Sequence, residues 1–129
     1  MSAEHPRSKY QFAVAPAGAP EQVLGTCGLR LPDAGSNVAE FGLELAAHHW
    51  GRRYGAEAAV ALLQFGFETL GLVAVRAETV SANIRAAALC RRLGFWGAGA
   101  RTGEAWLQQR GWYQQEWRLD REEWTIHRR

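Results

Sequence analysis

The feature that most constrains the fold is a change in the spacing of apolar residues between positions 38 and 79. Over residues 38–46 the side chains alternate, with Glu40, Gly42 and Glu44 on one side and Phe41, Leu43 and Leu45 on the other, which predicts a strand. Residues 56–70 switch to the i, i+3, i+4, i+7 spacing of a helix that buries one side, and Gly71 ends it. Residues 72–79 are short and rich in β-branched side chains, so a second strand follows. A strand, turn, helix and strand in this order predict two neighbouring parallel strands.

The flanking segments predict further strands and one more helix. Residues 10–15 and 22–31 form an expected hairpin, separated by a turn that contains Pro16, Gly18 and Pro20. A second helix is expected at 82–93, with Ser81 as its N-cap, Arg91 and Arg92 in its last turn and Gly94 as its C-cap. Two antiparallel strands are expected within 95–119. The chain of 129 residues has the size of one domain, so a single α+β domain over residues 1–129 is predicted.

Composition excludes several classes of protein. No apolar run is long enough to cross a bilayer, and the charged start MSAEHPRSKY does not resemble a secretory signal, so we expect a cytoplasmic protein. Cys27 and Cys90 lie far apart without the spacing of metal ligands, which favours reduced, buried thiols and no metal site. The net charge of +2 and the lack of a basic stripe with interleaved aromatics make a nucleic-acid partner a distant expectation.

The turn HHWGRRYGAEA at 48–58 allows two interpretations. A glycine-containing turn that leads into a helix exposes backbone N–H groups and the positive end of the helix dipole, which together suit a phosphate. Gly51 and Gly55 allow the backbone to approach such an anion, and Arg52 or Arg53 can add charge-assisted hydrogen bonds. Most turns of this kind are only connections, so the spacing alone leaves both interpretations open.

Several segments taken together resemble one family. They are EFGLEL at 40–45, WGRRYGAEA at 50–58, FETLGL at 67–72, Asn83, LGF at 93–95 and REEW at 121–124. In this order and spacing they are similar to the GNAT acyltransferases, and most similar to the branch that acetylates the N-termini of ribosomal proteins.

The resemblance implies a GNAT-like mixed, mostly antiparallel sheet with two principal helices, whose third strand and the strand at 72–79 diverge to admit acetyl-CoA. It assigns the pantetheine arm to the backbone from Leu45 to Ala47 and the pyrophosphate to the turn from Arg52 through Ala56. That turn comprises Arg52, Arg53, Tyr54, Gly55 and Ala56. Asn83 is the expected additional cofactor contact, and the turn is then a cradle for the diphosphate of the cofactor.

The chain departs from the family pattern at several places. Arg53 stands where the family usually has glycine, and Ala86 and Ala88 stand where it commonly has serine and arginine. Family members usually begin with another strand and two helices, and these helices wall the acceptor pocket. This chain starts almost directly at the next strand, so we expect an N-terminally truncated GNAT-like domain. Because missing helices would leave apolar surface exposed, we predict a homodimer.

Four residues are candidates for the general base that takes the proton of the acceptor amine. Glu44, which we favour, and Glu40 share the polar face of one strand, while His48 and His49 follow it. Cys90 stands where the wider family often has a catalytic tyrosine, and its spacing from Asn83 can place it towards the cofactor sulfur, although a packed core thiol is the competing interpretation. Trp106, Trp112 and Trp117 can line an acceptor pocket or a dimer contact, with core packing as the default.

Two functions are therefore considered. The first is an acetyl-CoA-dependent N-acyltransferase that transfers an acetyl group directly to the amine of a small molecule or a peptide N-terminus. The alternative is a catalytically silent GNAT-like module that binds a CoA species or a protein partner, supported by Arg53, Ala86 and the missing N-terminal elements.

Overall fold

The computed structural model describes residues 8–33, 35–45 and 54–127. Their helices and strands, in chain order, are β1 (Lys9–Val14), β2 (Gly25–Arg30), β3 (Val38–Leu45), α1 (Tyr54–Gln64), the π-helix η2 (Phe65–Thr69), β4 (Ala74–Val80), α2 (Ile84–Leu93), β5 (Trp96–Arg101), α3 (Ala105–Gln109), β6 (Gln114–Asp120) and α4 (Arg121–His127).

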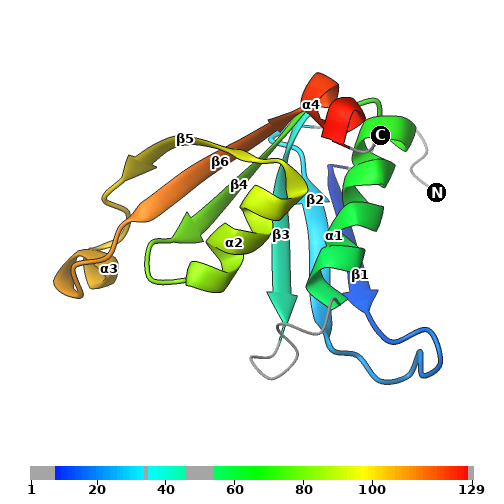
Figure 1. Ribbon diagram of the computed structural model, residues 1–129, viewed down its shortest axis with the longest axis horizontal. Helices are drawn as coiled ribbons and strands as arrows, with labels where there is room; N and C mark the ends of the chain where they lie inside the picture. The colour runs from blue at the N-terminus through cyan, green and yellow to red at the C-terminus, as the bar shows by residue number, and fades with distance from the viewer. Residues whose placement is uncertain (1–7, 34, 46–53, 128–129) are drawn as a thin grey trace.

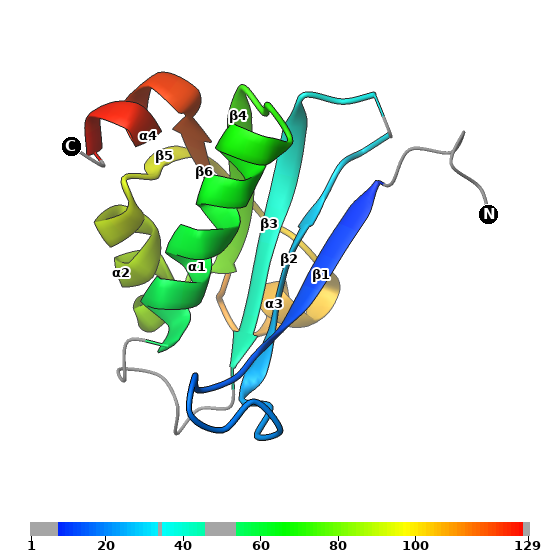
Figure 2. The same cartoon turned by 90° about the vertical axis from the view of Figure 1, so that its right-hand side faces the viewer.

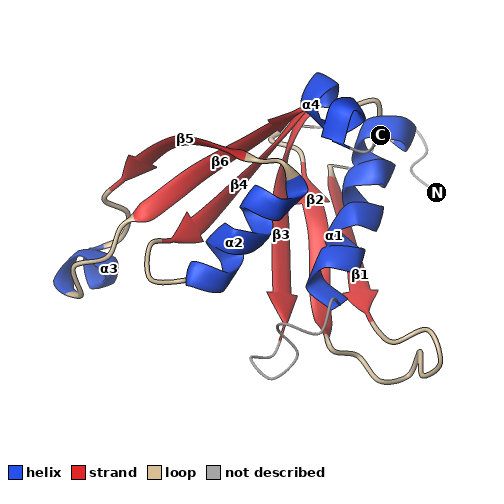
Figure 3. Ribbon diagram, viewed as in Figure 1, coloured by secondary structure: helices blue, strands red, loops and turns tan. Residues whose placement is uncertain are grey.

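The strands form one mixed sheet in the order β1-β2-β3-β4-β6-β5. β3 and β4 pair in parallel and every other neighbouring pair is antiparallel, which confirms the predicted mixed, mostly antiparallel α+β class. Figures 1 and 2 show that α1 and α2 lie side by side on the same face of the sheet. Figure 3 shows the strands fanning apart beneath them. We call the face without α1 and α2 the open face.

The core lies between the sheet and the two helices. The largest fully buried side chains are Phe67, Leu29, Leu63, Leu72, Leu107, Leu119 and Val75, and all of them except Leu107 of α3 belong to this core. The helix expected at 56–70 begins at Tyr54, and its last turn widens into η2, where the amide of Leu70 donates to the carbonyl of Phe65 over 3.0 Å. Gly66 permits this packing, because a Cβ there would lie 2.9 Å from Cδ1 of Leu29. The interior is thus apolar and closely packed.

The N-cap prediction for α2 was wrong. Asn83, not Ser81, caps the helix: its side chain accepts a hydrogen bond from the Ala86 amide over 3.0 Å, and the helix begins at Ile84 rather than residue 82. The Ser81 hydroxyl instead accepts from the amide of Tyr113 over 3.0 Å, so a tertiary contact takes the oxygen that a cap would use. The C-terminal prediction is confirmed, since Gly94 adopts a left-handed conformation with φ 96° after Arg91 and Arg92.

A clamp formed by Arg121 joins α4 to the end of η2. Its Nε donates to the carbonyl of Leu72 over 3.0 Å and its Nη2 donates to the carbonyl of Phe67 over 2.5 Å. The Phe67 ring also stacks on Trp124, with 5.6 Å between centroids. The REEW segment therefore fixes the end of the sheet opposite the site described below.

Both cysteines are buried free thiols, as predicted. None of the helices in the described residues is long and apolar enough to span a membrane.

Candidate functional site

The candidate site is a fork where β3 and β4 stop pairing. Their parallel register runs from Val38 opposite Ala74 to Phe41 opposite Ala77. Beyond these residues β3 continues to Leu45 paired with β2, and β4 continues to Val80 paired with β6. Within the described ranges, the backbone of Gly42 to Leu45 therefore has no strand partner on the side of β4. A small hollow of about 230 Å³ lies at the start of the fork, lined by Glu40, Phe41, Arg76, Ala77 and Glu78.

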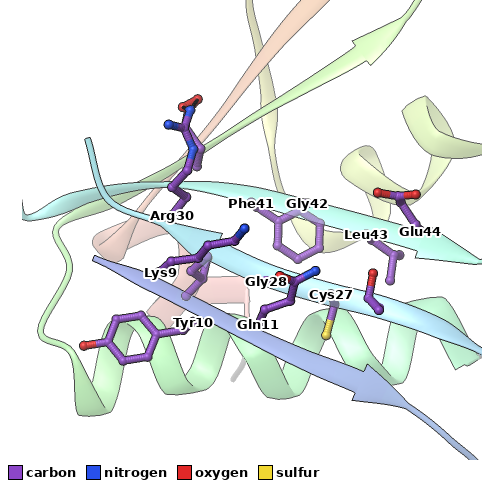
Figure 4. Close-up of a pocket in the computed structure, with 13 residues that line it drawn as sticks. Lys9, Tyr10, Gln11, Cys27, Gly28, Arg30, Phe41, Gly42, Leu43 and Glu44 are labelled. Carbon is purple, nitrogen blue, oxygen red and sulfur yellow. Dashed lines mark hydrogen bonds and ion pairs between the residues drawn. The ribbon is translucent and has the colours of Figure 1, made fainter. Parts of the chain in front are cut away.

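A second hollow of about 220 Å³ adjoins the fork on the open face of β1, β2 and β3. Gly28 and Gly42 lie directly opposite each other in the β2–β3 register, so β2 and β3 place no side chain in the middle of the hollow. Figure 4 shows Glu44 at one end and Arg30 at the other, with Lys9 and Gln11 along β1. The predicted alternation of β3 is confirmed here, because Phe41 and Leu43 pack against the core and Glu40 and Glu44 point to the opposite face.

Arginines neutralise most of the carboxylates at the fork. Arg30 on β2 donates to both carboxylate oxygens of Glu40, over 2.6 and 3.2 Å. Glu78 and Glu116 lie directly opposite each other on β4 and β6, where two like charges repel. Arg101 on β5 reaches both of them, with an ion pair to Glu78 and a 3.6 Å separation between its Nε and the Glu116 carboxylate.

Glu44 differs from these paired carboxylates. It is exposed and forms no hydrogen bond or ion pair with any residue in the described ranges. Its carboxylate is thus the acidic group at the fork that keeps its charge and its acceptor oxygens available for a ligand.

The two principal helices start at the same end of the molecule as the open end of the fork (Figure 1). Tyr54, Gly55 and Ala56 form the first turn of α1, where Gly55 is buried, and the side chain of Asn83 caps α2. The first-turn N–H groups of α1 and its dipole favour an anion at this position. The remaining predicted cofactor residues, Ala47, Arg52 and Arg53, lie outside the described residues, as do the base candidates His48 and His49; the side chain of Leu45 does as well.

Cys90 lies on the other face of the sheet from Glu40 and Glu44. It belongs to the apolar core beneath α2 and is 6% exposed. Burial raises its pKa to about 11, with a smaller opposing effect from the Arg91 guanidinium. The structure therefore does not bring Cys90 together with the two glutamates, and its surroundings are those of a packed thiol.

The polar residues of β4 and β5 were not predicted to belong to the site. The fork is lined by Arg76 and Glu78, and Arg101 forms an ion pair with Glu78. In the sequence, Arg76 and Glu78 alternate with the buried residues Val75 and Ala77, and this alternation could have placed Arg76 and Glu78 on the open face. Trp117 is buried under α2, where its Nε1 donates to the Thr79 hydroxyl over 2.9 Å. Trp106 of α3 and Trp112 lie together, with Arg110 over both rings. Figure 1 shows α3 near the far end of the β5–β6 arm.

Comparison with known proteins identifies the chain's relatives. Residues 1–96 match the family model described as the acetyltransferase (GNAT) domain. An uncharacterized N-acetyltransferase, p20, of Bacillus licheniformis is 33% identical over 75 residues, which are 58% of this chain and 42% of that protein. The chain thus matches less than half the length of this curated relative.

Solved structures of similar fold include spermidine N-acetyltransferases of Vibrio cholerae. A mutant form superposes with a TM-score of 0.80 at 21% identity, covering 94% of this chain and 70% of the other. A dodecameric form in an intermediate state gives a TM-score of 0.79 at 19% identity, covering 92% and 68% of the two chains. At this level of identity the likeness concerns the fold.

Proposed function

Because the chain belongs to the GNAT acetyltransferase family, we propose that it transfers the acetyl group of acetyl-CoA directly to the amine of a small molecule or a peptide N-terminus. The observation that carries the proposal is the fork. β3 and β4 part beyond Phe41 and Ala77, and the unpaired carboxylate of Glu44 stands on the open face beside the gap.

The residues around the fork fit acetyl-CoA as a substrate. The pantetheine arm contains amides. Gly42 to Leu45 pair with β2, but among the described residues they have no strand partner on the side of β4, so the backbone groups that point to that side are offered to an extended chain of this kind. The first turn of α1 from Tyr54 to Ala56 suits the diphosphate. We further propose that Leu45, Ala47, Arg52, Arg53 and Asn83 complete the cofactor contacts.

The chemistry follows from what acyl transfer needs. The amine nitrogen bonds to the thioester carbon, the carbon–sulfur bond breaks, and the nitrogen loses a proton. Glu44 is proposed to accept this proton, because its oxygens have no competing partner in the described part of the chain. Glu40 is the weaker candidate since Arg30 occupies both of its oxygens.

The departing thiolate must also be protonated, and Cys90 is a poor donor for this step. An ordinary thiol has a pKa of about 8.5, so its thiolate is too weak a base to take a proton from a thiol whose pKa is raised to about 11. The pKa and the burial of Cys90 favour the core-thiol interpretation, which leaves the proton to solvent or to another group.

The buried Cys90 also favours the alternative function. A GNAT-like module that lacks a proton donor at this position can bind a CoA species without turnover. Two measurements separate the functions. The first is the shift in melting temperature on adding acetyl-CoA, and the second is thiol release from acetyl-CoA over a panel of amines.

The panel should contain polyamines, because spermidine is the substrate named for the structural neighbours, and peptides with free N-termini. Stabilisation together with amine-dependent thiol release supports the transferase. Stabilisation without release for any amine supports the silent module. No stabilisation at millimolar acetyl-CoA would contradict the transferase and the CoA-binding form of the silent module.

A further inference from the structure

Arg76 lies on β4, in the interior of the sheet, and has no charged partner. The strand register places it directly opposite Glu40 on β3 and directly opposite Arg118 on β6. Arg30 donates to the Glu40 carboxylate over 2.6 Å. Arg118 donates to Asp120 over 2.7 Å, so both carboxylates on the neighbouring strands are already engaged. Arg76 is exposed and forms no hydrogen bond or ion pair with any residue in the described ranges.

The third carboxylate near Arg76 is engaged as well. Glu78 is the next residue on the same side of β4, two positions along the strand. Arg101 on β5 forms an ion pair with Glu78. The three surrounding carboxylates thus have arginines of their own. The guanidinium of Arg76 keeps its charge and its donors for an anionic group such as a carboxylate, which it can hold with two parallel hydrogen bonds.

A path without side chains leads from Arg76 to Glu44. The hollow lined by Arg76 and the hollow that ends at Glu44 have Glu40 and Phe41 in common, so the two hollows meet. Gly42 lies between Glu40 and Glu44 on β3 (Figure 4), and open space surrounds its Cβ position. Glu44 is four residues beyond Glu40, and Arg76 is one strand away from Glu40. The Cα atoms of Glu44 and Arg76 are therefore roughly 14 Å apart, given about 3.3 Å per residue and 4.8 Å between strands.

We propose that the acceptor is the N-terminus of an acidic peptide, with its amine at Glu44 and the acidic side chain of its third residue held by Arg76. This inference rests on the proposed acetyl transfer, because it places the acceptor amine at the same fork. An extended peptide advances about 3.3–3.6 Å per residue, so two residues and the two long side chains at the far end span the distance. A free amino acid carries its amine and carboxylate within one residue and cannot reach both groups. A polyamine would bring a second cation towards Arg76, and the like charges would repel.

Three pentapeptides with amidated C-termini test the assignment. They differ only in the third residue, which is glutamate, glutamine or lysine. In the thiol-release assay, kcat/KM should be about tenfold higher for the glutamate peptide than for the glutamine peptide, because a hydrogen bond between charged groups is stronger than a neutral one. The lysine peptide should be the poorest, and the preference for glutamate should decrease at high salt. Glutamate moved to the first residue should give no preference, since its carboxylate then lies too close to the amine.

Variants of Arg76 separate its contribution from the general charge of the open face. Arg76→Gln should lower the glutamate-to-glutamine ratio of kcat/KM to about one, and Arg76→Glu should make the lysine peptide the best of the three. Lys9→Gln is the matched control, because Lys9 is exposed opposite Arg30 on the far side of the adjoining hollow and also has no described partner. This control should keep the ratio of the natural chain. Circular dichroism establishes that each variant is folded. A ratio of about one in the natural chain, or an equal loss of the ratio in Arg76→Gln and Lys9→Gln, refutes the proposal.

Peptide binding without acetyl-CoA keeps this test separate from that of the proposed function. Calorimetric titration should show about tenfold tighter binding of the glutamate peptide than of the glutamine peptide to the natural chain, and equal binding of both to Arg76→Gln. Equal thiol release with all three peptides would support acetyl transfer and refute the role of Arg76. This binding difference without thiol release would support the role of Arg76 and contradict acetyl transfer to peptides. Equal binding without thiol release would contradict both.

Discussion

Thr79→Val removes one hydrogen-bond acceptor while keeping the shape of the side chain. Trp117 is 5% exposed, and its indole Nε1 donates to the Thr79 hydroxyl over 2.9 Å. Valine cannot accept this bond, and a buried donor left without a partner costs about 1–3 kcal/mol. At about 2.1 cal/mol/K per residue, the 129 residues give an unfolding entropy of about 0.27 kcal/mol/K. The melting temperature should therefore fall by about 4–11 °C.

The assay is thermal unfolding followed by circular dichroism or calorimetry, with two comparisons. Thr125→Val is the matched control, because the Thr125 hydroxyl donates to the Arg121 carbonyl over 3.1 Å at an exposed site, where the expected change is within about 0.5 kcal/mol. Thr79→Val combined with Trp117→Phe removes donor and acceptor together, so the double variant should lose less than the sum of the two single variants. If Thr79→Val and Thr125→Val shift the melting temperature equally, the indole is not left unsatisfied and the reasoning fails.

Three further predictions concern the base, the buried thiol and one glycine. Glu44→Gln should lower kcat/KM for thiol release by about 10²–10⁴-fold with little change in melting temperature, and Glu40→Gln should lower it much less; equal losses would contradict the choice of base. Because burial raises the pKa of Cys90 to about 11 from 9.0, the unfolded state ionises first, so stability to urea should fall as pH rises from 9.0 to about 11, and this component should be absent in Cys90→Ala. Gly94→Ala should cost about 1–2 kcal/mol because Gly94 has a φ of 96°, whereas Gly97→Ala, with open space around its Cβ position, should be nearly neutral in the same denaturant titration.

The elements that sequence predicted well are those whose pattern is local. The alternation at 38–46 identified which side chains of β3 leave the core. Helical spacing located α1 together with η2, and also α2, to within about two residues, but it did not predict that the first helix widens into a π-helix after Gln64. The short helices α3 and α4 were not predicted, since five and seven residues are too few to show a period. The choice between Ser81 and Asn83 as N-cap could not be made locally either. Both residues are good caps, and the hydrogen bond from Tyr113, 32 positions away, takes the Ser81 hydroxyl.

The candidate site was predictable in part, because its charges come together only through strand pairing. The spacing in the sequence could assign Glu40 and Glu44 to one face of the sheet. It could not show that Glu40 is ion-paired and Glu44 is not, because Arg30 comes to lie beside Glu40 only through the register between β2 and β3. The hollow over Gly28 and Gly42 likewise depends on these two glycines meeting across β2 and β3. No pattern within a single strand carries that information.

The distribution of charge at the fork has a consequence for how an amine would approach it. Glu78 and Glu116 would repel each other across β4 and β6, and Arg101 offsets both, while Arg30 offsets Glu40. These exposed ion pairs contribute little to stability, because water screens them. Their effect is to localise the negative potential, since neutralised carboxylates attract a cation weakly and an unpaired one attracts it strongly. A protonated amine would therefore concentrate at Glu44 rather than along the whole open face, and Glu44 is also the group proposed to take its proton. Replacing Arg30 or Arg101 would spread the attraction over several carboxylates, so binding would gain strength while the amine lost its single position beside the thioester.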